Sequence, residues 1–133
     1  MSFEVDFVDG EAALIDWLLD GALAARTTID ATVGNNLPGN WTVSSKPHLM
    51  VAHDGTPGAV WPIEEHQTIR VTAFARYQPD ARALARAAHR ACLAYPGKVD
   101  HLIGVAPAGK DPTTGAELAS GTVRFVAPAS QIA

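Results

Sequence analysis

The alternation of polar and apolar residues is most regular between residues 67 and 95. From 68 to 73 the two kinds alternate one by one, which is typical of a strand covered on one face. Pro79 then fits the first turn of a helix, where its missing N–H costs nothing. One face of that helix is apolar, with Ala81, Leu84, Ala85, Ala88, Cys92 and Tyr95 at helical spacing. Another face carries what we call the arginine stripe: Arg82, Arg86 and Arg90.

Weaker patterns predict the remaining elements. Asp9 is a good N-cap for a helix over 10–26, whose apolar face includes Leu14, Trp17 and Leu18. Short strands are predicted over 27–33, 48–53, 99–105 and 121–126. Turn-forming residues predict loops over 34–40 and 54–58, and a connector over 107–115.

The order of these elements predicts the fold class. A helix is followed by two or three strands, then by the second helix and two more strands. This order favours an α+β fold with a mostly antiparallel or mixed sheet of four to five strands and two helices packed on one face. The 133 residues show no compositional break, so we expect one domain over 1–133.

Composition narrows the functional classes. Apolar residues make up 47% and charged residues 18%, as in an ordinary folded protein. The formal net charge of −4 does not support a dedicated nucleic-acid binder, which would show a basic excess. The first residues lack the pattern of a signal peptide, and no apolar run approaches the roughly 20 residues that a membrane span needs. We therefore expect no membrane partner.

Motifs for chemistry are weak. Residues 104–111 match the phosphate-binding loop spacing, but Asp111 stands where Ser or Thr is required and Pro107 removes a backbone donor. The five histidines do not show the close spacing of metal ligands. Cys92 lies on the apolar helix face and is interpreted as a core residue. We assign no catalytic, cofactor or metal residue and expect no enzyme activity.

The arginine stripe allows three interpretations. It is the solvated face of an amphipathic helix, it meets acidic residues of a neighbouring copy, or it binds DNA phosphates. For the second interpretation the candidate partners are Asp16, Asp20, Glu64 and Glu65. Trp41 and Trp61 lie in or beside predicted loops, where a large aromatic residue either packs back on the domain or anchors a partner.

Several segments, in order along nearly the whole chain, resemble the tail terminator proteins of long-tailed bacteriophages, especially phages of actinobacteria. They are the first helix with DWLLDGALAA, Leu37-Pro38, HLMVAHDG, Val60-Trp61-Pro62, TIRVTAFA, the helix start from Asp80 to Ala85, and TVRFV.

The resemblance implies a structural virion protein without a cofactor. Such a subunit forms a ring, expected to be a hexamer, that caps the completed tail tube and joins it to the head connector. The implied partners are further copies of the chain, the major tail tube protein and the head-tail connector proteins, with DNA at most passing through the lumen. Assembly would take place in the host cytoplasm, and the mature location would be the neck of the virion.

Two other functions remain open from the sequence. One is a different neck or head-completion subunit, which fits the composition equally well. The other is a small soluble α+β enzyme or ligand-binding domain, which would require a pocket with converging polar groups.

Overall fold

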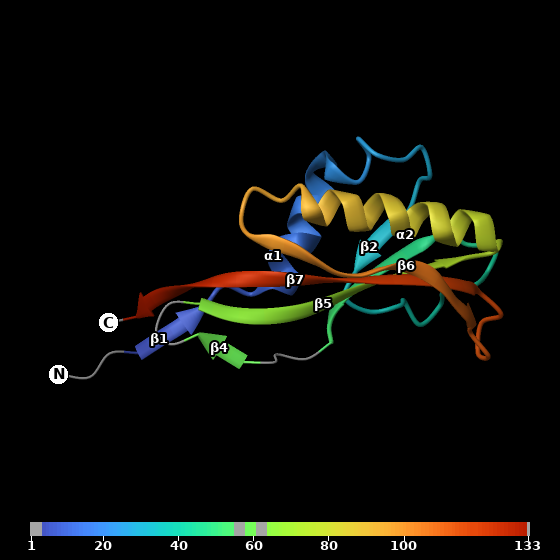
Figure 1. Cartoon of the computed structure of the whole chain (residues 1–133). Helices are drawn as coiled ribbons and strands as arrows, with labels where there is room; N and C mark the ends of the chain where they lie inside the picture. Colours follow the sequence, from blue (N-terminus) through green and yellow to red (C-terminus); the bar gives the residue numbers. More distant parts are fainter. Residues whose placement is uncertain (1–3, 55–57, 61–63, 133) are drawn as a thin grey trace.

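The centre of the fold is a pair of long antiparallel strands. The computed structural model describes residues 4–54, 58–60 and 64–132, and their side chains over 7–54 and 65–128. Strand β5 (Glu64–Ala75) pairs along its whole length with β7 (Glu117–Ile132), as Figure 1 shows. Residue pairs such as Val71 with Gly121 fix the register of this pair.

Each central strand carries two further strands end to end on its outer side. Strand β7 pairs with β6 (Val99–Lys110) and then with β1 (Glu4–Phe7). Strand β5 pairs with β3 (His48–His53) and with the short β4 (Gly58–Val60). Strand β2 (Thr32–Gly34) pairs with β3 in parallel and completes a mixed sheet of seven strands.

The helices cover one face of this sheet (Figure 1). Helix α1 (Gly10–Trp17) continues into a wider turn, η1 (Leu18–Ala22), and α2 (Gln78–Leu93) lies over β7, β5 and β6. The main core forms where Leu14 and Leu84 from the helices meet Val71 of β5. Burial of these apolar side chains is the main driving force for placing both helices on the same face.

The opposite face carries a smaller cluster. Phe74 lies between Ala73 and Ala75, which both belong to the main core, so its side chain points to the other side of the sheet. There it packs with Trp41 and Ala116. The segment between β2 and β3 therefore folds back over the helix-free face.

These findings confirm the α+β class, the mixed sheet and the packing of helices against it. The strand number differs from the four to five expected, because β1 and β4 are too short to leave a periodic signal. Since β6 and β1 share one side of β7, and β3 and β4 share one side of β5, the sheet is nevertheless five strands wide.

The boundaries of four elements also differ from prediction. The first helix does not run to residue 26, because Asp20 and Gly21 leave helical geometry and Gly21 adopts a φ of 106°. The strand predicted over 27–33 is reduced to Thr32–Gly34. The last two strands are longer than predicted, because β6 and β7 pair with each other as far as Lys110 and Glu117, and the end of β7 pairs with β5 and β1.

Candidate functional site

The arginine stripe lies on the solvent-exposed face of α2. Arg82, Arg86 and Arg90 are all exposed, and none forms an ion pair within the described part of the chain. Arg86 and Arg90 line a pocket of about 370 Å³ together with His89 and Val105. We call this the basic pocket; it lies between α2 and β6, and Arg82 is not among its lining residues.

His89 forms the inner wall of the basic pocket. Its side chain is 7% exposed, and its ring packs edge-on against His101 of β6, with 5.2 Å between centroids. Burial lowers the pKa of His89, and nearby His101 adds to this effect while backbone groups of Thr122 and Ile103 oppose it. The ring is therefore neutral at pH 7, and the positive charge of the pocket comes from its two arginines.

The fit between helix and strand depends on Gly121 of β7. A Cβ there would lie 2.9 Å from Val105 Cγ2 and 3.1 Å from His89 Cδ2. The missing side chain lets β6, β7 and α2 approach closely enough to form the pocket wall. Sequence reasoning missed this pocket, although His89 follows Ala85 by four residues and precedes Cys92 by three, a spacing that predicts the buried helix face.

The acidic candidates Asp16 and Asp20 lie together in a second depression. Both are exposed, and they line a shallow space of about 700 Å³ with Leu19, Trp17 and Tyr95, together with Ala13. Leu19 is 60% exposed, a large apolar side chain left in solvent. We call Asp16, Leu19 and Asp20 the acidic corner. Neither carboxylate forms an ion pair with another described residue.

The two charged surfaces lie on opposite sides of α2. Trp17 Nε1 donates a hydrogen bond of 2.7 Å to Ala91 O, which fixes α1 against one side of the helix. His89 contacts β6 on the other side. His89 and Ala91 are two positions apart, and at this spacing two residues point in nearly opposite directions around an α-helix. Helix α2 therefore separates the acidic corner from the basic pocket.

The other acidic candidates lie elsewhere. Glu65 Oε1 accepts a hydrogen bond of 3.0 Å from Gln67 Nε2, so its carboxylate is used inside its own chain. Glu64 begins β5 and pairs with Pro128, but its side chain falls outside the described residues, as does all of Trp61. The structure thus brings together Asp16 and Asp20 but places Glu65 in a separate structural network.

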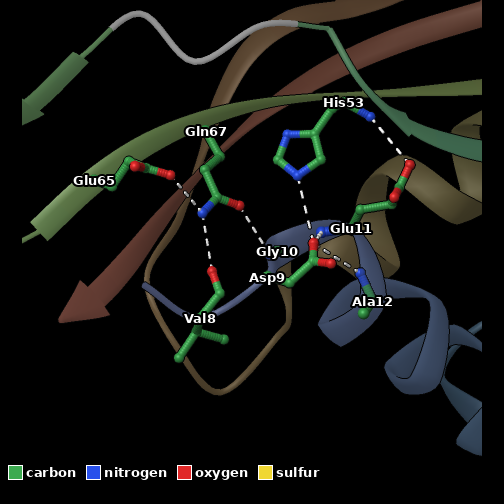
Figure 2. A network of polar contacts seen from close by, with 8 residues as sticks. All are labelled: Val8, Asp9, Gly10, Glu11, Ala12, His53, Glu65 and Gln67. Carbon is green, nitrogen blue, oxygen red and sulfur yellow. Dashed lines mark hydrogen bonds and ion pairs between the residues drawn. The ribbon is translucent and has the colours of Figure 1, made fainter. Parts of the chain in front are cut away.

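That network joins β5 to the start of α1 (Figure 2). Gln67 Oε1 accepts from Gly10 N at 2.8 Å, and its Nε2 donates to Val8 O at 2.9 Å. Asp9 Oδ1 accepts from the backbone N–H groups of Glu11 and Ala12, which confirms its predicted role as the N-cap. His53 Nε2 lies 3.4 Å from the same Asp9 oxygen.

Trp41 packs back on its own domain. It is 7% exposed, its ring meets Phe74 edge-on at 6.1 Å, and its Nε1 donates to Lys46 O at 2.8 Å. Of the two roles expected for this residue, the structure shows intramolecular packing and leaves little of the ring for a partner. Trp17, which the helical spacing places on the apolar face of the first helix, is half-buried between α1 and α2.

The segment that resembles a phosphate-binding loop is part of a strand. Residues 104–110 belong to β6, and Asp111 opens the turn to β7, where Thr114 donates to its carboxylate. This hydrogen bond is the main cause of the lowered pKa of Asp111. A turn and β7 follow it, so no helix within residues 111–132 supplies the N-terminal amides that such a loop requires.

The described residues form neither a metal centre nor a membrane-spanning helix. They contain no group of three or more His, Cys, Asp or Glu placed to hold a metal ion. None of the helices formed by these residues has the length and apolar character needed to cross a membrane. Cys92 is fully buried in the core, as expected, and burial raises the pKa of its thiol to about 12.

Comparison with known proteins adds no relative. No protein-family model matches the chain, and no curated protein matches it in sequence.

Proposed function

We propose that this chain is a structural virion protein whose copies form a closed ring at the end of a phage tail tube. The ring caps the completed tube and provides the surface on which the head connector docks. The sequence resemblance to tail terminator proteins supplies the identity of the assembly. On this proposal the chain acts through repeated contacts with its own copies and with neighbouring rings, and it has no catalytic role.

One structural observation supports self-association: the basic pocket and the acidic corner lie on opposite sides of α2 without intramolecular ion partners in the described part of the chain. A subunit with two different, complementary patches associates head to tail, and such contacts close into a ring when the rotation between copies permits. Opposite charges also direct the encounter of the two patches.

Native mass and electron microscopy test this proposal directly. The 14.0 kDa chain should assemble into a species of several copies, six being the expected number, either alone or on isolated tail tubes. Electron micrographs should show rings at the tube end that faces the head. A mass of one subunit at high concentration, with no rings and no binding to tail tubes, would contradict the proposal.

Binding specificity separates a tail terminator from another neck subunit. A terminator should bind tubes of the major tail protein in the absence of the connector. Binding to the connector without any binding to tubes would instead identify a head-completion or neck subunit.

A further inference from the structure

The basic pocket has the features of a site that receives a carboxylate. Two exposed guanidinium groups, Arg86 and Arg90, stand at its rim, and each can pair with a carboxylate through a planar fork of N–H donors. Behind them His89 is more than nine-tenths buried and closes the inner wall of the pocket.

The surroundings of this pocket are also apolar. Val105 lines it, and Ile103, two residues earlier on β6, is 58% exposed. An isolated surface ion pair contributes little to affinity because water competes for both charges. A ligand that brings a carboxylate together with an apolar group would therefore fit this surface better than a free anion.

The same chain presents such a ligand on the other side of α2. The acidic corner places the carboxylates of Asp16 and Asp20 beside Leu19, whose side chain is 60% exposed. Its wall includes the half-buried rings of Trp17 and Tyr95, which exclude water from one side. The basic pocket and the acidic corner thus carry opposite charges, and each also offers an aliphatic side chain.

We propose that the basic pocket of one copy binds the acidic corner of the next, with Arg86 and Arg90 pairing with Asp16 and Asp20 and Leu19 covered against β6. This pairing rests on the proposed ring and specifies the two surfaces through which neighbouring copies contact each other. A second copy is favoured over DNA as the occupant because it brings the exposed aliphatic side chain of Leu19 to Val105 and Ile103, whereas a DNA backbone brings charged phosphates. The net charge of −4 also opposes DNA binding.

Charge exchange between two variants tests this pairing. In Arg86→Glu/Arg90→Glu the pocket becomes acidic, and in Asp16→Arg/Asp20→Arg the corner becomes basic. Each variant alone should fail to assemble, because its two surfaces then carry like charges. A one-to-one mixture should assemble again, because the acidic pocket of the first variant can bind the basic corner of the second, and the basic pocket of the second can bind the acidic corner of the first. The two variants should then alternate around a ring of even number.

Two further variants locate the contact. Arg76→Glu/Arg82→Glu makes the same change in net charge outside the pocket and should weaken assembly much less. Leu19→Ala should weaken the association of two copies about tenfold or more, since the apolar contact is lost while both charges remain. Assembly is measured by native mass in solution and by ring formation on tail tubes.

The outcomes distinguish this pairing from the ring itself. If the wild-type protein assembles neither in solution nor on tail tubes, the proposed ring itself is wrong. Three outcomes would overturn the pairing while the wild-type protein still forms rings. Both charge-reversal variants assemble alone, their mixture fails to assemble, or Arg76→Glu/Arg82→Glu loses assembly to the same extent as Arg86→Glu/Arg90→Glu. A last experiment measures binding of a double-stranded oligonucleotide by fluorescence anisotropy. If the wild-type protein binds DNA and Arg86→Glu/Arg90→Glu does not, while its rings stay intact, the pocket binds phosphates.

Discussion

The side chain of Gln67 completes the start of α1 although 57 positions separate it from Gly10. Its carbonyl oxygen accepts the Gly10 N–H at 2.8 Å, and its amide nitrogen donates to Val8 O at 2.9 Å (Figure 2). Gly10 N belongs to the first turn of the helix, where backbone donors have no intrahelical acceptor. One buried amide of β5 therefore satisfies two backbone groups and fixes the position of α1 on the sheet.

Substitution of Gln67 tests this link. Gln67→Leu keeps the volume but leaves Gly10 N and Val8 O without their partner, so the free energy of unfolding should fall by about 2–3 kcal/mol. Urea denaturation followed by circular dichroism measures the change. Gln67→Glu is the matched variant: it preserves the acceptor but replaces the donor with a charge beside Glu65, so its stability should improve as the pH is lowered. Equal stability of Gln67→Leu and wild type would exclude this role.

Gly10 is required for a second reason, which is lack of space. A Cβ at this position would lie 2.6 Å from Phe125 Cγ and 2.7 Å from Gln67 Oε1. Gly10→Ala should therefore lower the free energy of unfolding by about 1–3 kcal/mol, despite the better helix propensity of alanine. Gly39→Ala is the control, because a Cβ there would meet open space within 4 Å, and it should change stability by no more than about 0.5 kcal/mol. Thermal melts of both variants make the comparison.

Trp41 anchors the segment between β2 and β3 to the helix-free face. Trp41→Ala removes the contact with Phe74 and should lower the free energy of unfolding by about 3 kcal/mol or more. Hydrogen exchange across 35–47 should accelerate before the rest of the sheet is affected. Trp41→Phe keeps an aromatic ring but loses the bond to Lys46 O, and about 1 kcal/mol is the expected loss. Unchanged exchange in Trp41→Ala would show that the segment is held by other contacts.

His48 should make stability depend on pH. It is 2% exposed, its Nε2 donates to Asn36 O at 2.7 Å, and its Nδ1 accepts from Thr32 Oγ1 at 2.6 Å. Burial lowers the pKa of His48 below its ordinary value of 6.5, although the bond to Asn36 opposes this shift. The unfolded chain therefore binds a proton more readily, so stability is complete above about pH 6.5 and falls as the pH decreases below that value.

The measurement compares urea midpoints at about pH 7.5 and 5.5. His48→Gln should be less stable than wild type at pH 7.5 but should lose less on acidification. Thr32→Val provides the control, because it removes a partner of the imidazole without removing the titrating group and should keep the pH dependence. If His48→Gln and wild type lose the same stability on acidification, His48 is not the responsible group.

Sequence patterns predicted the parts of this fold that have a long, regular period. Strand β5 and helix α2 were found because alternation and helical spacing are read directly from neighbouring positions. The first helix was predicted too long, because residues 10–26 remain apolar through the bend at Gly21 and periodicity is insensitive to a change of backbone geometry. Strands β1 and β4 were not found, because three or four residues carry too short a pattern.

The candidate site was only partly predictable for a related reason. The charges of Arg86, Arg90, Asp16 and Asp20 were visible, and so was their exposure on helices. Their distribution on two sides of α2 depends on which flank packs against α1 and which against β6, and tertiary contacts decide this. Gln67 did offer a local signal, since it continues the alternation of Ile69 and Val71 and puts a polar residue on the buried face.

The position of β7 in the chain order has a consequence for biosynthesis. It pairs with β1, β5 and β6, and all three precede it in the sequence. Until β7 leaves the ribosome, β5 therefore lacks its longest partner, and β1 and β6 lack their only strand partner in the described sheet. Their backbone amides and carbonyls stay open to pairing with other nascent chains during that interval. Folding yield at high expression should therefore be limited by how fast β7 is captured.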